Sequence, residues 1–450
     1  MSKPPDKDLG PSQQLTLFDS VCIIVGIIIG VGIFETTPKI AASVSGPAAL
    51  ISLWLVGGLL ALVGALCFAE LTTTYPKQGG DYVFLTKAYG RRTGFLFVWA
   101  QFWIIRPGNI GAMAFVYTRY ANQLIGLEPS RLTDTLLASS AVIVLTAINI
   151  LGVQSGKLTQ NLLTTFKVAG LLTVFAFAFS WIIPVGEPDP DSRLPNFGLE
   201  YALIMILFTY GGWNDISFVA AEVREPRKNL LRTLMLGTLV VTVVYLLVNL
   251  AFIFAMGYDG MASTRAIAAD LMHARLGVWG SRFISLLICC SALGAINGMT
   301  LTGARIYYAL GTEHPLFGWL GKWNQRFGAP IRALVGQGMV SLALIIALAS
   351  SDGFDRMVIF ATPLFWVFLL LVAIALFVLR HKDQESERPY HVILYPLTPI
   401  LFALTAVFII YSSTKFALSN INPEWVAALA LMTAGVLLSF CIPFSGKQGQ

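Results

Sequence analysis

The sequence predicts an all-α integral membrane protein, and three observations support this fold class. First, 56% of the 450 residues are hydrophobic and only 12% are charged, which leaves too little charge for the surface of a soluble protein. Second, apolar segments of about 20 residues, each long enough to cross a bilayer, recur along the chain. Third, glycines interrupt two of these segments at matching places in the two halves of the sequence.

Twelve segments are expected to be transmembrane helices. The interruptions fall in the first and the sixth of them. We therefore expect spans one to five (18–184) and six to ten (198–380) to form inverted five-plus-five repeats, with two additional helices (393–443) outside them. The chain 1–450 is interpreted as a single membrane domain with a cytoplasmic tail at 1–17. The twelve expected spans are 18–42, 47–74, 94–121, 134–154, 158–184, 198–221, 230–256, 279–311, 331–350, 355–380, 393–417 and 423–443.

The two glycine-broken segments contain Gly30–Gly32 and Tyr210–Gly212. Lipid cannot hydrogen-bond a backbone, so unwound peptide groups at membrane depth must be buried in protein or line a watery cavity. Paired breaks in two halves of a membrane protein are typical of a transporter site near the bilayer midplane. The alternative is that these glycines only allow helices to pack closely.

The first break predicts a site for a zwitterion. Freed amides at the start of the outer half-helix favour a carboxylate, because the helix dipole is positive there. Unpaired carbonyls near Ile28 and at the second break would attract an ammonium group, so the two breaks describe a receptor for an α-amino acid. The expected substrate-binding residues are Ile28, Gly30, Val31, Gly32, Ile33, Phe208, Tyr210, Gly211, Gly212 and Trp213.

Three aromatic residues, Phe208, Tyr210 and Trp213, surround the second break. Their rings could cover an apolar substrate and exclude water, and one of them could act as a gate. Each ring, taken alone, is more often a packing residue of a membrane helix than a gate. Phe208 is the residue that we favour as the gate.

Two basic residues, Lys167 and Arg106, fall well inside expected spans, where charge is costly and therefore indicates function. Lys167, near the middle of the fifth span, could carry a transported proton or could stay charged and tie the first break to span eight. The alternative is that it snorkels to an interface. Arg106 precedes Pro107, whose ring frees a carbonyl one turn earlier, and we expect it to bond between helices rather than bind substrate.

Acidic residues lie beside both breaks. Glu35 could steer cations in an outer vestibule or could simply occupy a solvated helix end, and Asp215 directly follows the second break. The run Glu222–Lys228 alternates in sign. Such a run predicts either ion pairs of an inner gate or a solvated turn, and the sequence leaves both open.

The net charge of +6 is explained by membrane orientation, because Lys and Arg accumulate in cytoplasmic loops. Both termini are expected to be cytoplasmic, and no nucleic-acid partner is expected. The four histidines lie in loops without metal-ligand spacing, and neither a phosphate loop nor a nucleophile elbow is present. The sequence therefore predicts a non-enzyme without a cofactor or metal. The five cysteines are interpreted as packing residues.

The chain resembles the amino acid-polyamine-organocation superfamily, and within it the L-type amino-acid transporter branch. The resemblance runs nearly from end to end. The segments that carry it are Gly30–Phe34, Ala69–Leu71, Pro76–Tyr82, Ile104–Pro107, Phe208–Asn214, Glu222–Asn229 and Arg388–Tyr390.

The resemblance implies a five-plus-five inverted-repeat fold and amino-acid transport, commonly by exchange. It implies that the amides of Val31, Gly32 and Ile33 bind the substrate carboxylate and that carbonyls near Ile28 and Phe208 bind the amino group. Phe208 would be the gating ring. Lys167 matches a fifth-span lysine that stands in for sodium in related exchangers, which argues against sodium coupling.

This sequence departs from the family pattern in two places. Val31 stands where the family usually has a small hydroxyl residue, so one expected hydrogen bond to the carboxylate is missing. The loop Arg119–Asp134 lacks the cysteine by which animal light chains bond a partner glycoprotein. We therefore expect no disulfide-linked heavy chain.

The leading hypothesis is a cell-membrane exchanger of neutral, fairly apolar L-amino acids that works by alternating access. Its basis is that the pocket motifs supply aromatic rings and backbone dipoles but no evident counter-charge for a substrate side chain. The alternatives are a proton-coupled amino-acid or polyamine symporter and a transporter-like membrane sensor. A lipid-processing enzyme is disfavoured because the spans offer no paired acid and nucleophile.

Overall fold

The computed structural model describes residues 11–180, 193–264, 267–349, 353–418 and 423–442. Within these ranges the chain is helical, with no strand and only two isolated β-bridges, Leu15 with Val223 and Asn324 with Ala329. The predicted all-α class is confirmed.

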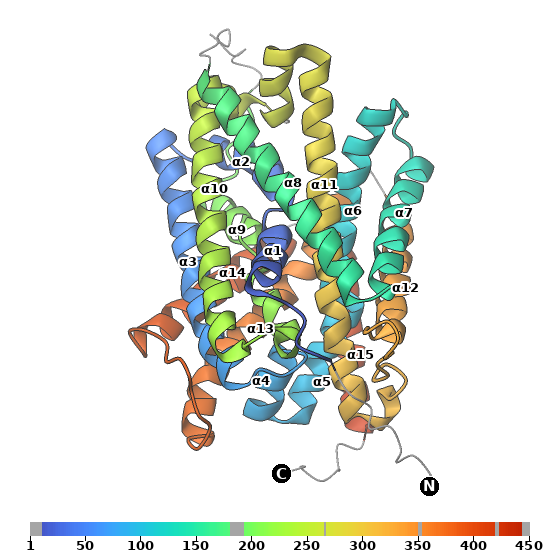
Figure 1. Ribbon diagram of the computed structural model, residues 1–450. Helices are drawn as coiled ribbons and strands as arrows, with labels where there is room; N and C mark the ends of the chain where they lie inside the picture. The colour runs from blue at the N-terminus through green and yellow to red at the C-terminus, as the bar shows by residue number, and fades with distance from the viewer. Residues whose placement is uncertain (1–10, 181–192, 265–266, 350–352, 419–422, 443–450) are drawn as a thin grey trace.

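The first half of the chain forms helices that lie side by side in a bundle (Figure 1). An additional short helix, α4, was not expected from the sequence. The elements are α1 (Leu17–Ile28), α2 (Gly32–Ala42), α3 (Pro47–Thr74), α4 (Asp81–Tyr89), α5 (Arg91–Ala100), the π-helix η1 (Gln101–Ile105), α6 (Arg106–Ile125), α7 (Arg131–Ile150) and α8 (Val153–Ser180).

The second half continues the bundle and adds two C-terminal helices. Its elements are α9 (Leu199–Thr209), the 3-10 helix η3 (Trp213–Glu222), α10 (Pro226–Ser263), α11 (Ile267–Glu313), η4 (Pro315–Phe317), α12 (Ile331–Ala347), α13 (Gly353–Lys382), α14 (Leu397–Leu418) and α15 (Pro423–Cys441).

Nine helices in the described ranges are long and apolar enough to cross a membrane, counting α9 with η3 as one. The bent pair α1–α2 would be a tenth. The two other expected spans correspond to the rod α5–η1–α6, which a π-helix interrupts, and to α12, which is only 17 residues long.

Two long helices kink at a glycine, and each kink lies within two residues of a span boundary expected from the hydropathy pattern. The long helix α10 kinks at Gly257 (φ 70°), next to the expected end of a span at residue 256. The helix α11 kinks at Gly277 (φ 57°), just before the expected start at residue 279. Side chains are strained at these backbone angles, so glycine allows the chain to turn there.

The short helix α1 lies inside the bundle, against α8, α10, α11 and η3 (Figure 1). A capping box fixes its start, because Thr16 Oγ1 accepts from the amide of Asp19 and the Asp19 carboxylate accepts from the amide of Thr16. The carboxylate of Asp19 also contacts Lys157 of α8 at 3.2 Å. The first break is therefore held at the centre of the molecule.

Candidate functional site

The first break separates α1 from α2, which are bent by 45° across Ile29–Val31. Within the described chain, the amides of Val31, Gly32 and Ile33 make none of the backbone hydrogen bonds found outside helices. The first amides of a helix also have no acceptor inside it, and no side chain caps α2. Three amides at the positive end of α2 therefore remain open to an anion.

The second break lies between α9 and η3. The amide of Gly211 turns back to the carbonyl of Phe208 at 2.9 Å, and Gly212 adopts a left-handed conformation (φ 113°). Glycine is required at position 212 for this backbone angle and also for space, because a Cβ there would lie 2.6 Å from Ile27. The turn between α9 and η3 thus packs directly against α1.

The two breaks meet at a second point. A Cβ on Gly32 would lie 2.9 Å from the side chain of Thr209, the last residue of α9. The Thr209 hydroxyl is 3.2 Å from that of Thr36 in α2. Gly30 is different, because a Cβ there would make an ordinary contact of 3.4 Å with Met113. Close approach between the halves, rather than an unusual backbone angle, therefore explains Gly32.

Side chains from other helices hold the carbonyls of the first break. Tyr245 of α10 donates its hydroxyl to the carbonyls of Ile28 at 2.7 Å and Thr209 at 3.2 Å, which links the two breaks. Ser291 of α11 lies within hydrogen-bond distance of the carbonyls of Ile29 and Gly30. These bonds satisfy backbone groups that an unbroken helix would have paired internally.

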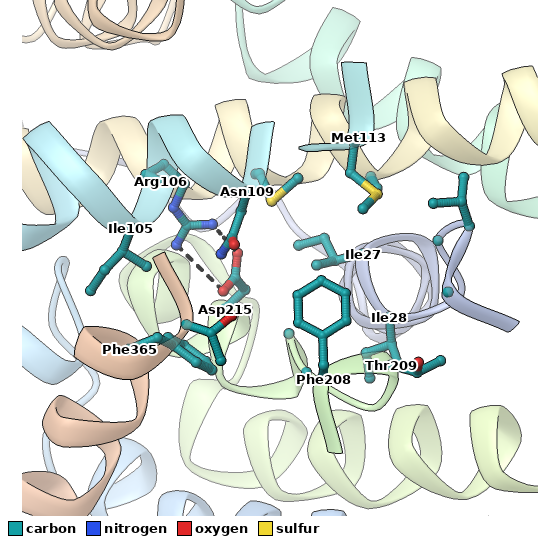
Figure 2. A pocket seen from close by; sticks show the side chains of 18 of the residues that line it. Ile27, Ile28, Ile105, Arg106, Asn109, Met113, Phe208, Thr209, Asp215 and Phe365 are labelled. Atoms are coloured by element: carbon teal, nitrogen blue, oxygen red, sulfur yellow. Dashed lines mark hydrogen bonds and ion pairs between the residues drawn. The ribbon is translucent and has the colours of Figure 1, made fainter. Parts of the chain in front are cut away.

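A cavity opens between the two breaks and the helices η1, α6, α11 and α13 (Figure 2). Phe208 and Ile27 face each other across it, with Met113 on one side and Arg106 and Asp215 on the other. The residues that line the cavity are Ile27, Ile28, Gly30, Val31, Gly32, Gln101, Ile105, Arg106, Asn109, Met113, Phe208, Thr209, Gly211, Gly212, Asp215, Ala295, Met299, Thr362, Phe365 and Trp366.

Most of the expected binding residues line this cavity. They are Ile28, Gly30, Val31, Gly32, Phe208, Gly211 and Gly212. Ile33 does not line it, and its side chain is fully buried in the core.

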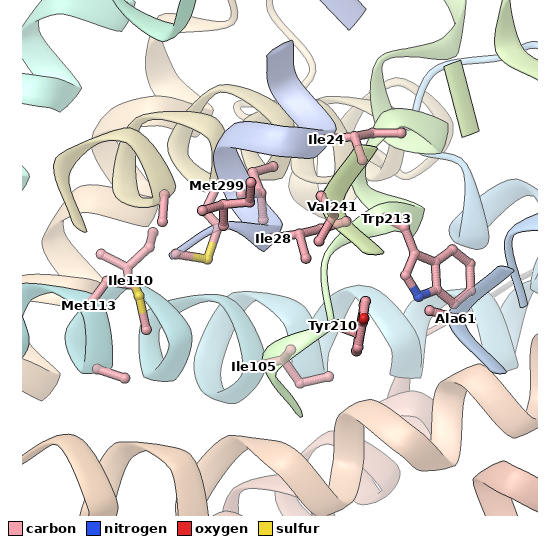
Figure 3. Close-up of a cluster of buried hydrophobic side chains, with 14 of the residues drawn as sticks. Ile24, Ile28, Ala61, Ile105, Ile110, Met113, Tyr210, Trp213, Val241 and Met299 are labelled. Carbon is pink, nitrogen blue, oxygen red and sulfur yellow. The ribbon is translucent and has the colours of Figure 1, made fainter. Parts of the chain in front are cut away.

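Tyr210 and Trp213 do not line the cavity either, and both rings are buried in the hydrophobic cluster that Figure 3 shows. The Tyr210 hydroxyl donates to the carbonyl of Trp54 at 3.0 Å. The Trp213 ring packs edge-on against Phe68, with centroids 4.9 Å apart. These two rings pack the bundle, whereas Phe208 alone of the three lines the cavity.

The ring of Phe208 forms part of a contact between α9 and α13. It meets Phe354 edge to face with the ring centroids 6.2 Å apart, a geometry that aromatic pairs favour. Phe208 is only partly buried, and it both borders the cavity and contacts Phe354.

Lys167 lies beside the first break but outside the cavity. Its ammonium group donates to the carbonyl of Gly26 at 2.7 Å, and the side chain is 1% exposed. A Cβ on Gly294 of α11 would lie 3.3 Å from the same nitrogen. The lysine is therefore wedged between α1 and α11 rather than extended toward an interface.

Sequence reasoning missed the charged wall of the cavity. Arg106 and Asp215 form a buried ion pair at 2.5 Å and 3.4 Å, and Thr302 donates to the same carboxylate at 2.8 Å. Arg106 bonds between helices as expected, but it also lines the cavity. The sequence offered no evident counter-charge for a substrate side chain, and this ion pair adds two charges to the cavity wall that are paired with each other.

Pro107 was the signal that could have revealed this wall. Proline has no amide hydrogen, so the regular pattern of α-helical backbone hydrogen bonds is interrupted there. The structure responds with the π-helix η1, in which the amide of Arg106 bonds the carbonyl of Gln101, five residues earlier. Short π-helices occur frequently at functional sites.

Glu222, the first residue of the run Glu222–Lys228 in which the charges alternate, forms a buried ion pair and does not lie in a solvated turn. Glu222 is 1% exposed and binds Arg305 of α11 at 2.8 Å and 3.1 Å. Gln78 donates to the same carboxylate, and the amides of Gln14 and Leu15 donate to the Glu222 carbonyl. The segments that contain Gln14, Gln78 and Arg305 therefore meet at Glu222, the last residue of η3.

Glu35 also has a partner. Its carboxylate accepts from Arg119 at 2.9 Å and from the hydroxyl of Tyr120 at 3.3 Å, which ties α2 to α6. Among the described residues, no cluster of His, Cys, Asp or Glu has the arrangement of a metal site.

A helical bundle that is apolar enough to cross a membrane, with a central cavity walled by two interrupted helices, defines a membrane permease. The family follows from the sequence: the chain belongs to the amino acid permease family, whose model matches residues 15–437.

Three characterised relatives cover most of the chain. The human b(0,+)-type amino acid transporter 1 is 27% identical over 435 residues, covering 95% of this chain and 87% of the relative. The serine/threonine exchanger SteT of Bacillus subtilis is 30% identical over 417 residues, covering 91% and 92%. The mouse large neutral amino acids transporter small subunit 2 is 29% identical over 439 residues, covering 95% and 80%. The resemblance found in the sequence is confirmed.

Proposed function

We propose that the protein exchanges neutral, fairly apolar L-amino acids across the cell membrane by alternating access. The observation that carries this proposal is the start of α2. Its first amides make no backbone hydrogen bond in the described chain, and this end of the helix borders a cavity with largely apolar walls. The names of the relatives support amino acids as the substrates and exchange as the mode of transport.

In the proposed binding mode, the amides of Val31, Gly32 and Ile33 hold the substrate carboxylate. The carbonyls of Ile28 and Phe208 hold the amino group. The Ile28 carbonyl already accepts from the Tyr245 hydroxyl and from the amide of Gly30, and the Phe208 carbonyl accepts from the amide of Gly211, so the ammonium group would share these carbonyls with their present donors or displace one of them. The broken backbone therefore recognises the part that all α-amino acids share.

Phe208 is proposed as the gating ring. Its contact with Phe354 joins α9 to α13, so displacement of the ring would open the cavity on that side. The buried pair of Glu222 and Arg305 is proposed as the inner gate on the cytoplasmic side. Alternating access then requires that the contact of Phe208 with Phe354 and the ion pair of Glu222 with Arg305 open one after the other.

Lys167 is proposed to stand in for a sodium ion, because its ammonium group binds the Gly26 carbonyl near the first break. Proton-coupled uptake is the second candidate function. It is favoured by the same residue, since a buried amine that hydrogen-bonds a carbonyl could release a proton during transport.

The proposed architecture has twelve spans, with the first and sixth unwound, and five-plus-five inverted repeats. It includes α5–η1–α6 and α12 as spans beside those that pass on length and hydropathy. Both termini are proposed to be cytoplasmic. The substrate and membrane lipid are the expected partners, without a disulfide-linked heavy chain.

Countertransport in proteoliposomes tests the proposal. Vesicles preloaded with leucine should take up external radiolabelled leucine much faster than empty vesicles. Equal uptake with and without internal amino acid would rule out exchange. Binding without any uptake would favour the membrane sensor, and a chemically altered amino acid would indicate an enzyme.

A further inference from the structure

One wall of the cavity carries polar side chains. The proposed binding of the substrate carboxylate and amino group by backbone amides and carbonyls does not involve them. Gln101, Arg106, Asn109 and Asp215 line this wall, and Figure 2 shows Arg106, Asn109 and Asp215 grouped on the side away from Met113. Gln101 and Arg106 are only 2% and 3% exposed. Such burial is costly for polar groups unless they find hydrogen-bond partners.

Two atoms of this wall have no such partner in the described part of the chain. They are the side-chain oxygen of Gln101, an acceptor, and Nε of Arg106, a donor. Buried polar atoms are nearly always paired, so an unpaired donor and acceptor on one cavity wall point to a ligand that supplies both partners.

The charges on the wall restrict what that ligand can be. The terminal nitrogens of Arg106 are engaged with the Asp215 carboxylate, so the pair neutralises itself. Because the pair is neutral overall, it offers no counter-charge to a cationic or an anionic group, and burying such a group in the cavity would be costly. A neutral group that both donates and accepts meets neither penalty, and a carboxamide is such a group.

The π-helix gives this wall its composition. Because η1 carries one extra residue in its turn, the residues before and after it face directions that a regular helix would not give them. Gln101, at the start of η1, and Arg106, directly after it, both reach the cavity. The position of Pro107 thus places a donor and an acceptor together on one wall.

We propose, on the basis of the proposed function, that Gln101 and Arg106 form a side-chain subsite for neutral amino acids that end in a carboxamide. The substrate amide nitrogen donates to the Gln101 oxygen, and the substrate carbonyl accepts from Nε of Arg106. Ile105, Met299 and Phe365 line the same cavity, so aliphatic side chains also fit, but they leave the two polar atoms unpaired.

The test compares substrates of matched shape in the exchange assay. Glutamine and methionine have similar size, as do asparagine and leucine, but only the first of each pair has a carboxamide. In the wild-type protein, glutamine should exceed methionine in kcat/KM by about tenfold for each of the two buried hydrogen bonds. Asparagine and leucine show at which side-chain length the preference appears.

Gln101→Met should lower the glutamine-to-methionine ratio by about tenfold, because it removes the acceptor and keeps the length of the side chain. The control is Thr233→Val in α10. Thr233 is also buried with an unpaired side-chain oxygen, but it does not line the cavity, so this variant should keep the wild-type ratio. A ratio measured within one variant is independent of how much protein folds.

Equal kcat/KM for the two members of both pairs in the wild-type protein would overturn the subsite without needing any variant. A ratio unchanged by Gln101→Met, or lowered equally by Thr233→Val, would also overturn it. If no neutral amino acid is exchanged at all, alanine included, the proposed function itself fails. The two failures are therefore distinguishable.

Discussion

The ammonium group of Lys167 lies 2.7 Å from the carbonyl oxygen of Gly26, so a lysine of α8 holds α1 just before its break. The same nitrogen borders Gly294 of α11. This arrangement matches one of the two roles that the sequence left open for Lys167, a tie between the first break and span eight.

Replacing Lys167 with Ala separates these roles. Loss of a buried, charge-assisted hydrogen bond should slow leucine exchange by about tenfold or more. If the lysine only ties the helices, exchange and uptake driven by a pH gradient fall together. If it carries the proton, gradient-driven uptake is lost while exchange from preloaded vesicles persists.

The control for this experiment is Lys415→Ala. Lys415 forms an exposed pair with Glu200, and exposed pairs contribute little to stability. Its loss should change neither assay. Wild-type rates for Lys167→Ala in both assays would dismiss any role of this lysine.

Gly32→Ala should abolish or strongly reduce leucine binding. The added methyl group would lie 2.9 Å from Thr209, which forces apart the two breaks that border the cavity. Gly32→Leu should be at least as severe, because it would fill the carboxylate niche. Equilibrium binding of radiolabelled leucine to purified protein measures the effect.

A double variant shows whether crowding is the cause. Thr209→Ala removes the atoms nearest the new methyl group, so Gly32→Ala with Thr209→Ala should recover part of the affinity. Gly46→Ala is the control, because a Cβ there has no neighbour within 4 Å. Full affinity in Gly32→Ala alone would contradict the proposed carboxylate site.

Phe208→Ala should reduce exchange by about tenfold, since the cavity loses its aromatic cover and the contact with Phe354. Phe208→Tyr keeps the ring and should retain most of the activity. Initial rates of countertransport, normalised to the amount of folded protein, provide the comparison. If the Ala and Tyr variants exchange leucine equally well, the ring is not a gate.

Glu222→Gln should destabilise the protein by about 3 kcal/mol or more, because it leaves Arg305 charged and buried without its partner. Glu225→Gln is the matched control three residues away, where the exposed contact with Lys228 contributes little. Unfolding midpoints in detergent should separate the two variants clearly. Equal midpoints would show that the buried pair does not hold the inner closure.

The glycines that the sequence singled out lie where the structure bends or packs most closely, because glycine has a direct physical meaning in a membrane helix. The left-handed angle at Gly212 and the close contact at Gly32 are properties that only glycine permits. The kinks at Gly257 and Gly277 likewise lie at the edges of the expected spans.

The cavity walls were harder to predict. A helix that is apolar on all sides does not reveal which side faces lipid, core or cavity. The sequence therefore could not separate Phe208, which lines the cavity, from Tyr210 and Trp213, which pack elsewhere. Nor could it pair Arg106 with Asp215 across 109 residues, because only the folded bundle brings these side chains together.

The most direct test of the account is a high-resolution structure of the protein with bound leucine. The account predicts that the leucine carboxylate lies within hydrogen-bond distance of the amides of Val31, Gly32 and Ile33, with its amino group at the carbonyls of Ile28 and Phe208. Leucine bound elsewhere, or a helix that runs unbroken from α1 into α2, would contradict it.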